Sequence, residues 1–290
     1  MRWRGRDAGW FGPGSVTWQL HSDPVMWIAG VRALYLQALH PGAVQGVLQN
    51  SDFRRDAWGR LLRTARFVAA LTYGRTEDAE EAAARVRRVH RHLSFTDPVD
   101  GRRRGVDEPE LLLWVHCAEV DSYLAVVRRS GLPLNDAQAD AYVREQRASA
   151  ALVGLDPTLV PGDTASLDAY LQGALPGLSV AAGAREVEAF LRRPPVPLPL
   201  LPLRATLWRH LSGLAYDTLP PFARDLYGRP SPPPEVVTRR LRRTGAALRA
   251  LPARLRWSLP PRHILRAVAR LGPGSRPAPG AVPAVPVRHP

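Results

Sequence analysis

Three pieces of sequence decide the fold: WGRLLRTARFV (58–68), AAARVRRVHRHLSF (82–95) and DEPELLLWVHCAEVDS (107–122). Each piece has the spacing of apolar residues that is typical of a packed helix, and each carries polar side chains on that apolar scaffold. We expect the three helices to pack together. They would then enclose a cavity that receives arginines, a hydroxyl group and one or two imidazoles.

The polar side chains recur at helical spacing. Arg60, Arg63 and Thr64 stand at positions i, i+3 and i+4 and therefore share one helix face. Arg87 and His90 repeat the i, i+3 spacing in the next helix. Because a guanidinium group binds a carboxylate through two parallel hydrogen bonds, the pattern predicts an anion clamp. The alternative is that the arginines reach solvent and the threonine bonds back to a carbonyl.

His90 is a candidate metal ligand of an unusual kind. His92 lies two residues further on, so the two imidazoles do not share a helix face and cannot chelate one ion together. A single imidazole suits a haem iron, which takes four nitrogens from the macrocycle and one histidine from the protein. The two propionates of a haem need cations, and Arg60 and Arg87 are of the expected type. The alternative is that this arginine-rich helix presents a solvated face to water.

His116 and Cys117 lie in an apolar run, where burial raises the pKa of a thiol. A cysteine nucleophile with its base is therefore disfavoured, and His116 is expected to be a buried scaffold or pocket residue. His40, at a helix end before proline, is open to two interpretations: a structural cap or a pocket residue.

Composition narrows the class of protein. With 290 residues, of which 45% are hydrophobic, the chain is long enough for one large helical domain or two small ones. No apolar run is long enough to span a membrane and no signal-peptide pattern is present, so we expect a cytoplasmic protein. The single cysteine excludes an intramolecular disulfide. The sequence lacks four common catalytic or binding motifs: the nucleophile elbow, the phosphate-binding loop, the dinucleotide-binding motif and the HExxH zinc motif.

The net charge of +14 belongs mainly to the C-terminus. Residues 237–290 contain 12 arginines and no acidic residue, so the rest of the chain is nearly neutral. The arginine-rich helices expected within 234–271 predict peripheral contact with an anionic membrane surface. A packed helix pair with a solvated basic face is the alternative. Nucleic acid is not expected as a partner, because only Trp257 is available there for base stacking.

Helical periodicity and capping residues predict an all-α fold, a single domain of about ten helices. Residues 94–106 are expected to form a charged loop, and the proline-rich segment 192–204 to be largely extended. We expect an N-terminal arm (1–22), a helical domain (23–232), a basic helical extension (233–271) and a disordered Pro/Arg-rich tail (272–290). The expected helices cover residues 24–39, 41–51, 56–73, 76–93, 107–129, 136–153, a short stretch from 164, 184–192, 204–217, 220–227, 234–250 and 261–271.

Seven short motifs, spread over most of residues 24–228, form a pattern that is specific as a whole. They are LQALHPGAVQGV (36–47), SDF (51–53), WGRLLRTARFV (58–68), VRRVH (86–90), DG (100–101), DEPELLLWVH (107–116) and LYG (226–228). Together they resemble the latex-clearing proteins (rubber oxygenases) and the MpaB-type oxygenases, most closely the actinobacterial members.

This resemblance implies a globin-like helical core around a haem b, whose iron uses dioxygen to cleave double bonds of an apolar, isoprenoid or lipid-like substrate. The family's Arg-x-x-Lys-Thr motif lines the haem pocket and looks like Arg60, Arg63 and Thr64 here. Its Arg-x-x-His motif supplies the iron ligand and looks like Arg87 and His90. The resemblance therefore predicts that His90 binds the iron, that Arg60, Arg87 and Thr64 hold the haem, and that Arg63 is catalytic on the distal side.

The sequence also departs from the family pattern. The family's lysine is Arg63 here, and an arginine stays protonated, so it can donate hydrogen bonds to dioxygen or a propionate but cannot be a neutral amine ligand. HRHLSF (90–95) and RRRGVDEP (102–109) differ from the expected motifs, and no carboxylate aligns with the family's catalytic glutamate. A non-catalytic helical protein that binds haem or an apolar ligand is the alternative function.

Overall fold

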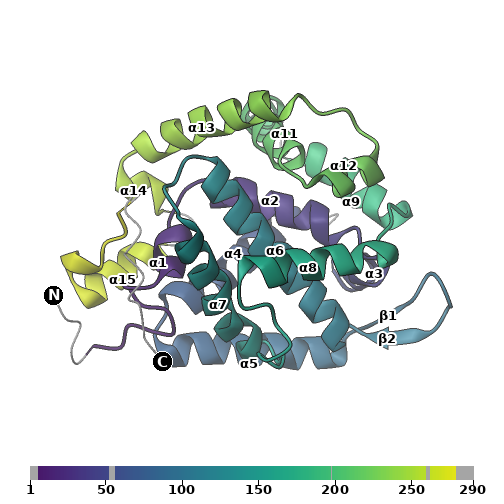
Figure 1. Cartoon of the computed structure of the whole chain (residues 1–290), viewed down its shortest axis with the longest axis horizontal. Helices are drawn as coiled ribbons and strands as arrows, with labels where there is room; N and C mark the ends of the chain where they lie inside the picture. Colours follow the sequence, from purple (N-terminus) through teal and green to yellow (C-terminus); the bar gives the residue numbers. More distant parts are fainter. Residues whose placement is uncertain (1–5, 52–55, 197, 259–261, 279–290) are drawn as a thin grey trace.

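The structure, a computed structural model, describes residues 6–51, 56–196, 198–258 and 262–278. It confirms the predicted all-α class (Figure 1). The helices of the first half are α1 (Val16–Leu20), α2 (Met26–Gln37), α3 (Pro41–Asn50), α4 (Ala57–Tyr73), α5 (Thr76–His92), α6 (Pro109–Arg129) and α7 (Asp136–Leu152). Those of the second half are α8 (Thr164–Ala174), α9 (Ala182–Arg192), α10 (Leu201–Leu203), α11 (Arg209–Asp217), α12 (Pro221–Tyr227), α13 (Pro234–Ala250), α14 (Ala253–Arg256) and α15 (His263–Leu271).

Helices α2 and α6 form the centre of the molecule. They pack along each other, and α9 and α11 also pack on α2. Both helices are therefore apolar around most of their circumference, with their buried side chains in the main core. Among the described residues, no helix is long and apolar enough to span a bilayer.

A buried ion pair joins the two central helices. The guanidinium of Arg32, with a side chain only 3% exposed, donates to Asp121 Oδ2 at 2.7 Å. It also donates to Ser122 Oγ at 2.7 Å and to the Thr218 carbonyl at 3.1 Å. Because every contact of this cation comes from another element, Arg32 fixes α2 against α6 and the end of α11.

Several local expectations were wrong. The expected loop 94–106 contains a two-stranded antiparallel hairpin, β1 (Ser94–Thr96) and β2 (Arg103–Gly105), whose strands are too short to show an alternating pattern. The proline-rich segment contains a 3₁₀ turn (Leu198–Leu200) and α10, because prolines in first turns cost no hydrogen bond. A π-helical turn (Arg204–Trp208) follows and begins the stretch expected as the helix 204–217.

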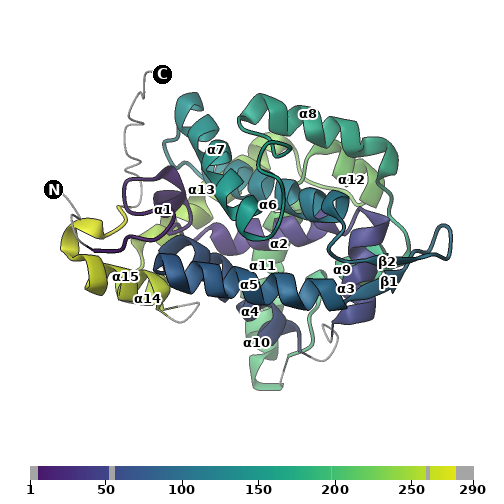
Figure 2. The ribbon, with the colours of Figure 1, turned by 90° about the horizontal axis from the view of Figure 1, so that it is seen from below.

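The two chain ends pack against each other, which the sequence pattern did not indicate. The indole of Trp18 in α1 donates to the Ser275 carbonyl, and the indole of Trp257 donates to the Ser22 carbonyl. In Figure 2, α14 and α15 accordingly lie beside α1. The expected N-terminal arm thus includes a buried helix, and the expected disordered tail begins with a 3₁₀ turn (Pro273–Ser275). Residues 279–290 lie outside the described part.

Close packing of α3 and α9 gives a test of the fold. A Cβ added at Gly183 would stand 2.8 Å from Leu48 Cδ1 and 3.1 Å from Val44 Cγ1. We expect Gly183→Ala to lower the free energy of unfolding by about 1–3 kcal/mol, because the two helices must separate. Gly173 in α8 has no such neighbour within 4 Å, so Gly173→Ala should raise it by about 0.5–1 kcal/mol. Urea denaturation measures both, and effects of the same sign would contradict this packing.

Candidate functional site

Helices α4 and α5 form an antiparallel hairpin that carries every predicted site residue. Asp56 caps α4 by accepting from the Gly59 amide, and Gly74 ends it. Arg60 stands 13 residues before Tyr73, and His90 stands 14 residues after Thr76. Since both helices rise 1.5 Å per residue, these two side chains lie at about the same height in the hairpin.

His90 has the properties of a free ligand. It is half-buried near the end of α5, and burial lowers its pKa, an effect that the charge of Asp107 partly offsets. Neither ring nitrogen has a hydrogen bond to another residue in the described parts of the chain. The imidazole is therefore neutral at pH 7 and keeps a lone pair available. The described residues contain no cluster of three or more His, Cys, Asp or Glu side chains suited to hold a metal ion.

Arg60 and Arg87 are half-buried on the same hairpin. Arg60 donates to the Ser51 hydroxyl, and burial together with neighbouring Arg63 lowers its pKa. Arg87 donates to the Leu152 carbonyl at the end of α7. These contacts fix both cations near the end of the hairpin that carries His90. Ser51 is the described part of the SDF motif; Asp52 and Phe53 lie outside the described residues.

Arg63 and Thr64 are placed differently. Both side chains are exposed, and Arg63 pairs with Asp56 across 2.8 Å. The structure thus places Arg60, Arg87 and His90 at half-buried positions of the same hairpin and leaves the other two predicted site residues at the solvent edge.

An acid on the central helix α6, Glu119, is not among the site residues predicted from the sequence. Burial raises the pKa of the Glu119 carboxyl to about 7, while a hydrogen bond with Tyr123 acts in the opposite direction. One turn earlier, burial lowers the pKa of His116 to about 4. Glu119 can therefore gain or lose a proton near neutral pH, whereas His116 is neutral. In the sequence, the available signal for Glu119 was its position three residues after His116, inside an apolar run.

A hydrogen-bonded chain of polar side chains lies beside Glu119. The Thr72 hydroxyl donates its one proton to the Val68 carbonyl at 2.8 Å, so it accepts from His21 Nδ1 at 2.8 Å. The other nitrogen, His21 Nε2, then accepts from the Tyr142 hydroxyl at 3.1 Å. Burial lowers the pKa of His21 to about 3, which is consistent with this neutral tautomer. Burial raises the pKa of Tyr142, and the negative charge of Glu119 raises it further, so the two groups are coupled.

His40, which the sequence left open, and Cys117, which the sequence disfavoured as a nucleophile, have structural roles. His40 Nδ1 accepts from the Ala43 amide at 3.3 Å and caps α3. Cys117 is buried, and burial raises the pKa of its thiol to about 12, which makes it unreactive at neutral pH.

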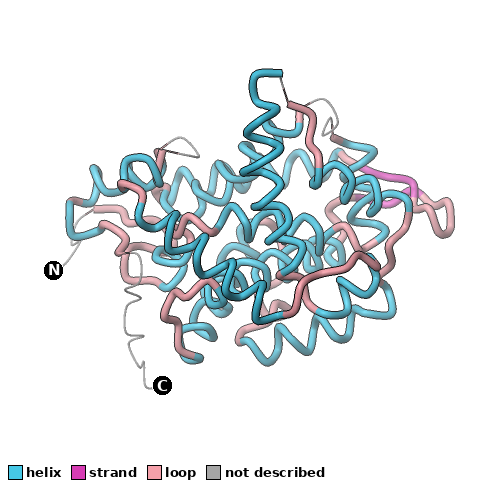
Figure 3. Tube along the Cα trace, turned by 90° about the horizontal axis from the view of Figure 1, so that it is seen from above, coloured by secondary structure: helices cyan, strands magenta, loops and turns pink. Residues whose placement is uncertain are grey.

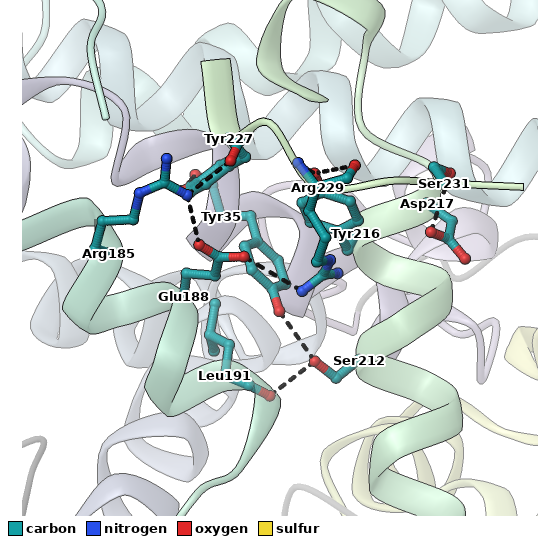
Figure 4. Close-up of polar contacts among 10 residues, drawn as sticks. All are labelled: Tyr35, Arg185, Glu188, Leu191, Ser212, Tyr216, Asp217, Tyr227, Arg229 and Ser231. Carbon is teal, nitrogen blue, oxygen red and sulfur yellow. Dashed lines mark hydrogen bonds and ion pairs between the residues drawn. The ribbon is translucent and has the colours of Figure 1, made fainter. Parts of the chain in front are cut away.

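A second polar cluster, shown in Figure 4, locks helices together. Glu188 pairs with Arg185 at 3.1 Å and Arg229 at 3.4 Å. Tyr227 of the LYG motif donates to the Tyr35 carbonyl at 2.7 Å, and Arg229 stacks 3.4 Å above the Tyr216 ring. Because these groups satisfy one another, we assign the cluster a structural role.

The structure is thus an all-α fold with a half-buried imidazole and two half-buried arginines on one helical hairpin, and with a carboxyl on the central helix whose pKa burial raises to about 7. Residues 18–250 match the family model of the ER-bound oxygenase mpaB/B'/rubber oxygenase catalytic domain. The chain belongs to this family, and it is an oxidoreductase of the oxygenase type that uses dioxygen and a substrate. Neither a curated protein nor a solved structure matches the chain.

Proposed function

We propose that the protein is a haem b-dependent oxygenase acting on an apolar, isoprenoid or lipid-like substrate. The observation that carries the proposal is His90: a neutral, half-buried imidazole without a hydrogen bond to a described residue, level with a half-buried arginine on the neighbouring helix. One such imidazole suffices for a haem, because the macrocycle supplies the other four nitrogens. Bound haem would supply the binding and activation of dioxygen.

The arginines fit the charge of a haem. Arg60 and Arg87 would hold the two propionates, since their cations are fixed by the Ser51 hydroxyl and the Leu152 carbonyl rather than by carboxylates. Arg63 and Thr64 are exposed, and we propose that they act at the solvent edge. Contact of Arg63 with a propionate suits this position better than contact with dioxygen, and the test below separates this role from the predicted catalytic one.

Glu119 would accept and donate the proton that is transferred in the reaction. Its carboxyl changes protonation near neutral pH, and Tyr123, Tyr142 and His21 surround it with groups that hold protons in defined positions. His116 and Glu119 keep some accessible surface although burial shifts both of their pKa values strongly. Both side chains are therefore largely withdrawn from bulk water beside α6.

We also propose that residues 234–271 make peripheral contact with an anionic membrane surface. Four arginines of α13, Arg239, Arg240, Arg242 and Arg243, are exposed, while Val237 and Leu241 pack inward. Such a face attracts acidic lipid headgroups.

The absorption spectrum of protein produced with a haem supply tests the cofactor. We expect a Soret band in the wild type, and its loss or a strong shift in His90→Ala, because the iron loses its protein ligand. His92→Ala is the matched control: His92 is an exposed histidine of the same helix, and its removal should leave the band unchanged. A wild-type protein without a Soret band would refute the proposal.

Two further measurements sharpen the assignment. Loss of the band in His116→Ala, with a normal band in His90→Ala, would move the iron ligand to α6. An oxygen electrode with polyprenyl substrates separates oxygenase from binding protein: haem retention without dioxygen consumption would favour the non-catalytic alternative.

Arg63→Ala should lower dioxygen consumption if Arg63 is catalytic, and should only weaken haem retention if it holds a propionate.

A further inference from the structure

An apolar projection distinguishes residues 198–207, which we call the leucine tip. Leu198, Leu203 and Leu207 are 80%, 52% and 47% exposed, respectively. Figure 2 shows α10 at the far end of a helical column that projects from the body, and Figure 3 shows the same projection from the opposite side. An apolar surface on a projecting tip is costly in water and therefore indicates a binding role.

Polar side chains of the tip donate to nearby backbone carbonyls. Thr206 donates to the Pro202 carbonyl at 2.8 Å, and Arg204 donates to the Pro194 carbonyl at 3.3 Å. The proline nitrogens have no hydrogen to donate, and the tip consists of helical turns, a geometry in which backbone amides pair within the turn. The tip therefore has few unpaired polar groups, and this is what insertion into an apolar medium requires.

Cations surround the base of the tip. The sequence contains no acidic residue between Glu188 and Asp217, and Arg192, Arg193 and Arg209 in this stretch are exposed. A groove of about 480 Å³ at the base is lined by Arg209 and His210 of α11 and by Arg240 of α13; Asp217 is the acid that borders it. The charge at the base therefore matches an anionic partner.

We propose that the leucine tip inserts into the headgroup region of an anionic lipid bilayer, with the surrounding arginines on the lipid phosphates. A convex, leucine-rich projection with cations at its base fits a deformable bilayer better than the flat surface of a protein partner. The proposal goes beyond the oxygenase assignment and does not depend on haem. It also differs from contact through residues 234–271, because its anchor is apolar.

Flotation of the full chain with vesicles tests the tip. We expect binding to vesicles of equal parts phosphatidylglycerol and phosphatidylcholine, and weak binding to phosphatidylcholine alone. The variant Leu198→Ser/Leu203→Ser/Leu207→Ser should lower binding at least tenfold. Val99→Ser/Leu159→Ser is the control, because these side chains are 83% and 70% exposed on other parts of the surface, outside residues 234–271. It should bind like the wild type.

A fluorescent label shows where the membrane is contacted. Cys117 is buried with a raised thiol pKa, so an environment-sensitive dye will label Leu203→Cys selectively. We expect a blue shift on addition of anionic vesicles for this position and none for Val99→Cys. His90→Ala should bind vesicles normally, which separates this test from that of the cofactor.

Four results would overturn the proposal. The wild type could fail to float with anionic vesicles. The serine variant could float as well as the wild type, a result that would assign membrane binding to residues 234–271. The dye at position 203 could also remain in water on bound protein. A concentration-dependent dimer that the serine variant abolishes, without vesicle binding, would make the tip a contact between two copies of the chain instead.

Discussion

Replacing Glu119 by glutamine is expected to reduce dioxygen consumption by a factor on the order of 10²–10⁴ and, at the same time, to stabilise the fold. The amide keeps the size of the side chain but cannot take up the proton. In the wild type, the rate should change with pH around the carboxyl pKa of about 7, and the variant should lose this transition. An oxygen electrode over pH 5–9 measures both effects.

The stability effect has the opposite sign because burial opposes the charged carboxylate. The pKa of Glu119 is 4.5 in the unfolded reference and about 7 in the fold, so the folded state holds its proton more tightly. The wild-type free energy of unfolding therefore falls as pH rises from 4.5 to 7 and levels off above that. Glu119→Gln should remove this loss and gain on the order of 2 kcal/mol at pH 8, with little change at pH 4.

Glu80→Gln is the control for Glu119, because Glu80 is exposed on α5. It should change neither rate nor stability. A Glu119→Gln variant that loses stability at pH 8 would show that the carboxylate is structurally required. A Glu119→Gln variant with a normal rate and pH profile would show that Glu119 takes no part in the reaction.

Asp121→Ala is expected to lower the free energy of unfolding by about 3–5 kcal/mol, a large part of the stability of an ordinary domain. The substitution leaves the Arg32 guanidinium, 3% exposed between α2 and α6, without its countercharge. Ser122 and the Thr218 carbonyl still accept hydrogen bonds from it, but neither carries a charge. Urea denaturation followed by circular dichroism measures the loss.

An exposed ion pair provides the matched comparison. Arg85 and Glu81 of α5 are 3.2 Å apart, with side chains more than two thirds exposed, so Glu81→Ala should cost less than about 0.5 kcal/mol. The double variant Arg32→Met/Asp121→Leu should recover most of the loss, because removing both charges also removes the uncompensated one. A double variant as unstable as Asp121→Ala would mean that the hydrogen bonds of Arg32, rather than its charge, hold the two helices.

The predictable part of the site is the part that lies within one stretch of chain. Spacings of three and four residues placed Arg60, Arg63 and Thr64 on one face of α4, and Arg87 and His90 on one face of α5. These spacings could not show that Arg63 would be held at the surface by Asp56, seven residues earlier. They also could not show the raised pKa of Glu119, because it is caused by the burial of α6 beneath other helices.

By itself, the sequence determined the all-α class, most helix boundaries and the family, because helical periodicity, capping residues and short motifs are local properties of the chain. The tertiary structure decided what is buried and what meets across the fold. It packed the chain ends together through Trp18 and Trp257, gave Glu119 a pKa near neutrality, and left three leucines exposed on a projecting turn. Burial depends on which elements cover a residue, and the covering elements come from distant parts of the chain.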